Sequence, residues 1–285
     1  MTRPAGPEER AVTVTTSDGF PLSVTAFEAR QPQAQIVLLA PANGVPARFY
    51  RPFASWLAAQ GFTTVTWDWR GLGDTAPTSL RGFDATMLDW ATADQPAVFD
   101  WAHERYDSPI IGIGHSFGGQ VFGLAGDPQR FARIILFGAS NAYWRLWPAP
   151  FRYGFRAWVG AMRVATAVAG YLPGRQLGLG ADLPAGVARQ WLQWCLHPDY
   201  HQRWQGHAQI TAPVLSYAFS DDRYAPLAAR QDLLGRYGGQ KTLLTPTPRE
   251  FGLRRVGHFD FFRKHNATIL WPAFLPHLRI AQPES

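Results

Sequence analysis

The sequence predicts an α/β fold in which strands and helices alternate around one mostly parallel sheet. Short apolar, strand-like segments recur along the chain, and helical stretches alternate with them from residue 47 onward, which is typical of a parallel sheet covered by helices. With 285 residues, of which 46% are hydrophobic, the chain is long enough for one large domain. The eight expected strands are 11–15, 22–26, 35–40, 62–67, 109–113, 133–137, 214–219 and 241–244.

The loop after the fourth expected strand contains Asp68, Arg70 and Asp74. We expect these three residues to hold this loop in place. Asp89 and Asp94 lie on the expected helix before the fifth strand, where solvent exposure or a buried pair with an arginine is the expected state.

The fifth expected strand leads into Gly114-His115-Ser116-Phe117-Gly118, a G-x-S-x-G motif. In a nucleophile elbow of this form, the serine lies in a strained turn between a strand and a helix, and the flanking glycines let the backbone pass close to its neighbours. Residues 120–125 predict the short helix that should follow. Ser116 is therefore the candidate nucleophile. The alternative is a glycine-rich turn in which Ser116 only caps that helix, whereas a dinucleotide loop is excluded because Phe117 stands where its third glycine is needed.

Two later segments contain a carboxylate and a histidine in suitable positions. Asp221 and Asp222 follow the strand-like run 214–219, and an acidic residue at the carboxyl end of a strand is well placed for a site in an α/β sheet. His258 follows a glycine and lies among aromatic residues. The alternative role for the two aspartates is that both only cap the helix that begins near Ala225.

Together these segments resemble an α/β-hydrolase: a serine elbow, a D-x-x-A-P turn and a G-H-F-x-F-F histidine stand in that family's order, and the resemblance spans nearly the whole chain. Further segments resemble a bacterial subgroup of predicted hydrolases related to serine aminopeptidases and acylglycerol lipases. The resemblance implies the α/β-hydrolase fold and a catalytic triad of Ser116, Asp222 and His258. Asp222 fits the turn because Pro226 lies four residues beyond it, so Asp221 is expected only to cap the helix. The segments of this chain that resemble the bacterial subgroup are 49–51, 67–74 and 89–91.

The resemblance also implies an oxyanion hole, with one N–H from the residue after the nucleophile and one from the loop after the third strand. The first donor is Phe117. Many relatives have His-Gly in the second loop, but this chain has Pro41 there, whose nitrogen cannot donate. Ala42 or Asn43 is therefore expected to supply the second donor. Losing one donor typically lowers the rate about a hundredfold to a thousandfold.

A long insertion separates the sixth and seventh expected strands. We expect residues 141–210 to form a helical cap over Ser116, with helices at 155–171 and 188–195, and residues 1–140 and 211–285 to form the core domain. This segment contains six of the twelve tryptophans, and seven arginines against two aspartates. One interpretation is an apolar acyl-binding cleft with a basic rim that attracts anionic substrates or makes peripheral contact with a membrane. The other is that the tryptophans pack the cap on the core and the arginines keep its surface soluble.

Other features exclude several classes of protein. The chain has a net charge of +6 but contains no dense run of lysines and arginines and no nucleic-acid-binding motif. No nucleic-acid partner is therefore expected. His197 and His201 lack the glutamate of a zinc motif and have Pro198 between them, and the remaining histidines call for no role, so neither a metal nor another cofactor is expected. The single Cys195 reads as a buried helix residue. No signal peptide and no membrane-spanning run is visible, which predicts a cytoplasmic protein.

The sequence thus predicts a serine hydrolase that cleaves a carboxylic ester of a small, apolar acyl substrate through an acyl-enzyme on Ser116. Two alternatives remain open. One is a non-catalytic binder of small ligands, suggested by the altered oxyanion loop. The other is acyl transfer, thioester or amide cleavage, or other non-hydrolytic chemistry on the same residues. The oligomeric state is left open.

Overall fold

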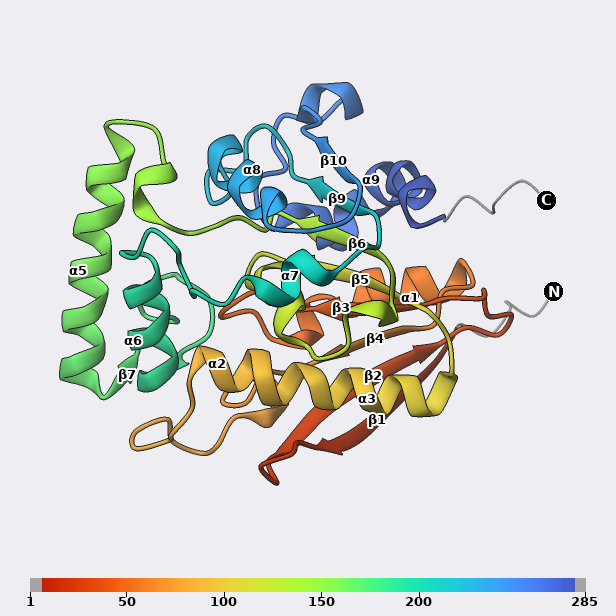
Figure 1. Ribbon diagram of the computed structural model, residues 1–285, viewed down its shortest axis with the longest axis horizontal. Helices are drawn as coiled ribbons and strands as arrows, with labels where there is room; N and C mark the ends of the chain where they lie inside the picture. The colour runs from red at the N-terminus through yellow and green to blue at the C-terminus, as the bar shows by residue number, and fades with distance from the viewer. Residues whose placement is uncertain (1–6, 280–285) are drawn as a thin grey trace.

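Eight strands form one twisted sheet in the computed structural model, which describes residues 7–279 (Figure 1). The strand order is β1-β2-β4-β3-β5-β6-β9-β10. β1, β2 and β4 pair antiparallel, and all remaining pairs are parallel. The strands are β1 (Glu8–Thr15), β2 (Pro21–Glu28), β3 (Ile36–Ala40), β4 (Thr64–Trp67), β5 (Ile110–His115), β6 (Phe131–Phe137), β9 (Val214–Tyr217) and β10 (Lys241–Leu244). The expected mostly parallel eight-stranded sheet is confirmed.

Helices cover both faces of this sheet. One hydrophobic cluster packs α3 and α8 on one face, and a second cluster packs α1 and α9 on the other. The helices outside the long insertion are α1 (Arg51–Ala59), α2 (Met87–Asp89), α3 (Gln95–Tyr106), α4 (Phe117–Gln120), α8 (Leu227–Gly235) and α9 (Ala267–Phe274).

The central strands are apolar because they are buried on both faces. In β3, Leu38 belongs to the cluster with α3, whereas the adjacent Val37 and Leu39 belong to the cluster with α1 and α9. In β6, Leu136 and Phe137 are divided between the two clusters in the same way. Side chains alternate between the faces of a strand, so a strand with helices on both sides reads as a continuous apolar run.

The long connection between β6 and β9 forms the outer part of the molecule, with α5 at its edge (Figure 1). We refer to residues 141–210 as the inserted segment. Its elements are α5 (Phe151–Ala169), β7 (Tyr171–Leu172), β8 (Leu183–Pro184), α6 (Ala185–Trp194) and α7 (Gln205–Gln209).

Both helices expected in the inserted segment are present, with different ends. α5 begins at Phe151 and stops at Ala169, because Gly170 adopts a left-handed conformation with φ of 78° and ends the helix. The expected helix ran on to Tyr171, which instead begins β7, paired antiparallel with β8. α6 begins directly after Pro184. Cys195 is buried at the end of α6.

Two of the three residues expected to hold the loop after β4, Asp68 and Arg70, do so through their side chains, and Asp74 contributes its backbone N–H. Arg70 forms a buried ion pair with Asp94 and a second pair with Asp18, both at 2.6 Å. Both carboxylate oxygens of Asp68 accept backbone N–H groups, from Ala47 at 2.7 Å and from Asp74 at 2.9 Å. Within residues 7–279, no helix is long and apolar enough to span a bilayer.

Candidate active site

Ser116 occupies a strained turn between β5 and α4. Its φ of 52° and ψ of −116° lie in a region that non-glycine residues rarely adopt. The turn is held by a hydrogen bond from the Ser116 N–H to the carbonyl of Phe137, at 2.9 Å, and by another from the Gly119 N–H to the Ser116 carbonyl, at 3.1 Å. The serine is half-buried. This geometry is that of a nucleophile elbow.

The glycines of the motif allow the close approaches that this turn requires. A Cβ on Gly114 would lie 2.3 Å from the Cα of Gly119, and a Cβ on Gly118 would lie 2.3 Å from the carbonyl oxygen of Ala40. Neither position tolerates a side chain without moving backbone. The elbow therefore packs against the end of β3, where the second oxyanion donor is expected.

The helix after the elbow is shorter than expected. α4 ends at Gln120, and residues 122–124 form a 3-10 turn instead of continuing the predicted helix over 120–125. Side chains from distant segments bind the carbonyls at its end: the Tyr237 hydroxyl donates to Gly119 at 2.9 Å, and Nε2 of His207 bonds the Gln120 carbonyl at 2.9 Å.

Asp222 and His258 form a buried hydrogen-bonded pair. Nδ1 of His258 lies 2.8 Å from Oδ2 of Asp222, and the two side chains are 4% and 2% exposed. The other carboxylate oxygen of Asp222 accepts the N–H groups of Tyr224 and Ala225. With an ionised Asp222 as acceptor, the proton of a neutral His258 lies on Nδ1, which leaves Nε2 free to accept one. This is the arrangement of an orienting carboxylate and a general base.

Asp221 differs from the expectation that it caps a helix. α8 begins at Leu227 after Pro226 and has no side-chain cap. The two Asp221 oxygens instead accept the N–H groups of Val256 and Gly257, each at 3.0 Å. Asp221 therefore holds the loop that carries His258.

The turn of Ser116 and the Asp222–His258 pair meet at the carboxyl ends of β5, β6 and β9. Gly138 follows Phe137, the hydrogen-bond partner of Ser116, and a Cβ on Gly138 would lie 3.1 Å from both Asp222 and the His258 ring. Within residues 7–279, no hydrogen bond joins the Ser116 hydroxyl to His258. Such bonds are often long before substrate binds.

A buried hydrogen-bond chain links the loop after β3, which contains Ala42, to the loop that contains His258. The Ala42 N–H donates to the Tyr50 hydroxyl at 2.9 Å, and that oxygen lies 2.7 Å from Nδ1 of His115. Nε2 of His115 lies 3.0 Å from the carbonyl oxygen of His258. A carbonyl only accepts, so His115 carries its proton on Nε2 and Tyr50 donates to Nδ1. Tyr50 and His115 are fully buried, and this burial lowers the pKa of His115 well below its ordinary value, so the ring is neutral.

The expected oxyanion donors lie around the elbow. Phe117 is the first residue of α4, and its buried ring packs edge-on against Trp69 and Trp90. Ala42 is buried, and its N–H is the group bound by Tyr50. Asn43 is half-buried, and its Oδ1 is a buried atom with no hydrogen-bond partner within the described residues.

Sequence reasoning missed Tyr50, the contacts of Asp221 with the His258 loop, and the hydrogen bonds of three histidines, His115, His201 and His207. Each of these residues binds a partner that is distant in the sequence, and no local motif predicts such a contact. Nε2 of His201 and Nε2 of His207 both bond the Gln120 carbonyl, at 3.3 Å and 2.9 Å. No group of three or more His, Cys, Asp or Glu side chains across residues 7–279 is arranged to hold a metal ion.

With this geometry in view, the comparisons with known proteins identify the family. The model of the serine aminopeptidase S33 family matches residues 28–179, more than half of the chain. The chain therefore belongs to this family of hydrolases, which lies within the α/β-hydrolase superfamily, and the predicted resemblance is confirmed. A search of curated proteins found no match.

Solved structures agree on the fold. An esterase from Exiguobacterium antarcticum is 14% identical with a TM-score of 0.63, covering 94% of this chain and 99% of that one. A thermophilic esterase from Thermogutta terrifontis is 18% identical with a TM-score of 0.58, covering 95% and 98%. A hydrolase from Pseudomonas aeruginosa is 19% identical with a TM-score of 0.55, covering 85% and 94%. At these identities the similarity establishes the α/β-hydrolase fold.

Proposed function

We propose that the protein is a serine carboxylesterase whose nucleophile is Ser116. The observation that carries the proposal is the combination of a strained Ser116 elbow and the buried 2.8 Å contact of Asp222 with His258, at adjoining strand ends. His258 Nε2 takes the hydroxyl proton as Ser116 Oγ attacks the ester carbonyl, and Asp222 stabilises the imidazolium. The proton then passes to the leaving alcohol. Water activated by His258 releases the acid from the acyl-enzyme.

We assign the two oxyanion donors to the backbone N–H groups of Phe117 and Asn43. Phe117 directly follows the nucleophile and begins α4. Of the two candidates in the second loop, Ala42 has its N–H bound to Tyr50, which supports Asn43. An N–H already committed to a buried hydroxyl is a poor donor to a developing oxyanion.

The inserted segment is proposed as a cap on a core formed by residues 1–140 and 211–285. Two contacts support this assignment. The Ala181 N–H donates to the carbonyl of Gly44 in the oxyanion loop at 2.8 Å. The indole N–H of Trp147 donates to the carbonyl of Arg223, next to Asp222, at 3.2 Å.

We propose a small, apolar acyl substrate and a cytoplasmic protein. Aromatic side chains border the site: the Tyr224 ring is 62% exposed and lies 5.2 Å from the His258 ring. The basic, tryptophan-rich inserted segment also suits peripheral contact with a membrane.

The test is hydrolysis of p-nitrophenyl esters of increasing acyl length by the wild type and by Ser116→Ala. We expect the variant to lose at least about a thousandfold in kcat, because it lacks the nucleophile. Ser108→Ala serves as the control and keeps its activity, because Ser108 precedes β5 at the end opposite Ser116 and its hydroxyl bonds only the carbonyl of Tyr106. Equal turnover by Ser116→Ala and the wild type, or a folded wild type with no turnover on any ester, would contradict the proposal.

A second pair of variants tests the choice between adjacent aspartates. Asp222→Asn should lower kcat by about ten-thousandfold, since the amide favours the wrong His258 tautomer. Asp221→Asn, which touches only backbone N–H groups, should cost far less. The reverse order would assign the orienting role to Asp221.

A further inference from the structure

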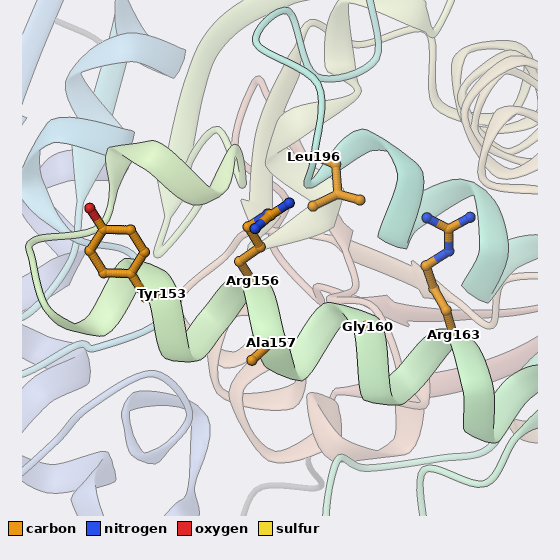
Figure 2. A pocket seen from close by; sticks show the side chains of 6 residues that line it. All are labelled: Tyr153, Arg156, Ala157, Gly160, Arg163 and Leu196. Carbon is orange, nitrogen blue, oxygen red and sulfur yellow. The ribbon is translucent and has the colours of Figure 1, made fainter.

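A groove runs along the outer helix α5, away from the proposed catalytic residues. It encloses about 300 Å³ and is lined by Arg156, Arg163, Gly160, Tyr153, Ala157 and Leu196. Figure 2 shows Arg156 and Arg163 pointing to the same side of α5, toward Leu196. An adjoining groove of about 560 Å³ shares Arg156 and Leu196 and adds Arg145 and Trp144. We call the two together the arginine groove. None of Ser116, Asp222 and His258 lines it.

The three arginines of this groove have no anionic partner within the described residues. All arginine ion pairs within residues 7–279 involve arginines outside this groove. The inserted segment contains seven arginines and only two acidic residues, Asp182 and Asp199, and these pair with Arg175 and Arg236. A surface that only needs solubility usually mixes both signs of charge. The groove therefore presents a local positive charge that the protein does not neutralise.

The groove also contains an apolar and aromatic wall. The guanidinium groups of Arg145 and Arg156 lie 5.2 Å and 5.5 Å from the centre of the Trp144 ring. This stacking orients a guanidinium and leaves its N–H groups free for an anion. Tyr153 is 63% exposed, and Leu196 is half-buried. Such a site suits a ligand with one anionic end and one apolar end.

We infer that the arginine groove binds an anionic amphiphile, with its phosphate or carboxylate on Arg145, Arg156 and Arg163 and its apolar part along Tyr153, Ala157 and Leu196. Arginine holds such oxygens through paired N–H donors. The inference does not rest on the proposed esterase activity.

The first test measures binding of dodecyl phosphate by calorimetry, in a Ser116→Ala background that excludes any turnover at the proposed nucleophile. Arg156→Gln and Arg163→Gln should each weaken binding about tenfold or more, and rising salt should weaken it further. Arg189→Gln removes an exposed arginine of the same segment that does not line the groove, so it should bind like the parent. Equal binding by the parent and by both groove variants overturns the inference.

The second test blocks the groove. A Cβ at Gly160 or at Gly154 meets no atom within 4 Å, so a side chain can leave the backbone at either position without a clash at its first atom. Only Gly160 lines the groove. Gly160→Phe should abolish binding of dodecyl phosphate, and Gly154→Phe should retain it. Unchanged binding by a folded Gly160→Phe protein contradicts the assigned site.

Two further probes identify the source of the ligand. Inorganic phosphate should bind at least tenfold more weakly than dodecyl phosphate, and equal affinity would refute the role of the apolar wall. Vesicles of phosphatidylglycerol and of phosphatidylcholine are compared in a flotation assay. Arg156-dependent binding to the anionic vesicles alone supports a lipid headgroup as ligand, whereas binding of free dodecyl phosphate without vesicle binding supports a soluble one.

Discussion

The hydroxyl of Tyr50 makes two buried hydrogen bonds at once, accepting from Ala42 and donating to His115. Tyr50→Phe removes both and leaves a buried N–H and a buried ring nitrogen without partners. Each such group costs about 1–3 kcal/mol. We therefore expect a loss of at least about 2 kcal/mol in the free energy of unfolding, measured in urea.

The same variant should lower kcat at least about tenfold with little change in KM, because the loop that carries Asn43 loses its anchor. Tyr106→Phe is the matched control, since its hydroxyl bonds Glu28 at the far side of the sheet. Its kcat should equal that of the wild type. If both variants retain full kcat, Tyr50 has only a structural role.

At the residue scale, local motifs predicted Ser116, Asp222 and His258 because each lies in a short pattern with its own mechanical reason. The contacts of Asp221 and Tyr50 could not be predicted. Tyr50 meets His115, which lies 65 residues further along the chain, and Asp221 binds Val256, 35 residues further along. Nothing near either residue in the sequence records such a partner.

At the element scale, the elbow depends on the absence of side chains. Gly114→Ala should destabilise the protein by about 2 kcal/mol or more, because its Cβ would lie 2.3 Å from the Cα of Gly119 and backbone must move. Gly154→Ala provides the opposite case, since Gly154 lies on α5 and a Cβ there would have no atom within 4 Å. It should stabilise the protein by about 0.5–1 kcal/mol.

Thermal or urea unfolding of the two variants tests this contrast. Equal stability of Gly114→Ala and the wild type would show that the elbow does not need its glycine.

The elements differ in how far the sequence could predict them. The central strands β3, β4 and β5 were predicted because burial on both faces makes them continuous apolar runs. α4 was not, because its end is set by side chains of Tyr237 and His207 that arrive from distant segments. The carboxyl end of α5 depended on the left-handed Gly170, whereas the sequence prediction continued that helix to Tyr171.

At the scale of the whole molecule, two neutral histidines lie buried where the inserted segment packs on the core. Burial lowers the pKa of His201 to about 3 and that of His207 to about 4, from 6.5. Between those values and pH 6.5, the unfolded chain binds more protons than the folded protein. The free energy of unfolding should therefore fall as the pH falls below about 6.5, by up to about 1.4 kcal/mol per pH unit for each histidine.

Urea unfolding at pH 7.5, 6 and 5 measures this slope. His207→Gln keeps a donor for the Gln120 carbonyl but does not titrate, so it should lose less stability on acidification than the wild type. The exposed His103→Gln serves as the control and should follow the wild type. Identical slopes for the wild type and His207→Gln would contradict the prediction.

Composition, length and the strand pattern predicted a mostly parallel eight-stranded sheet with flanking helices and a long insertion after the sixth strand. The sheet, the flanking helices and a long connection between β6 and β9 are observed. They could not predict how the insertion packs. The inserted segment contacts core residues that lie far away in the sequence, as Ala181 does with Gly44.

The hydrogen bond between Gly44 and Ala181 also has a consequence for folding kinetics. It joins the loop after β3 to a loop that follows three further strands of the sheet, β4, β5 and β6, and α5. Closing so long a stretch of chain is entropically costly and is favoured only once the intervening sheet has formed. The loop that holds Asn43 is thus expected to reach its final conformation late, after most of the sheet is already in place.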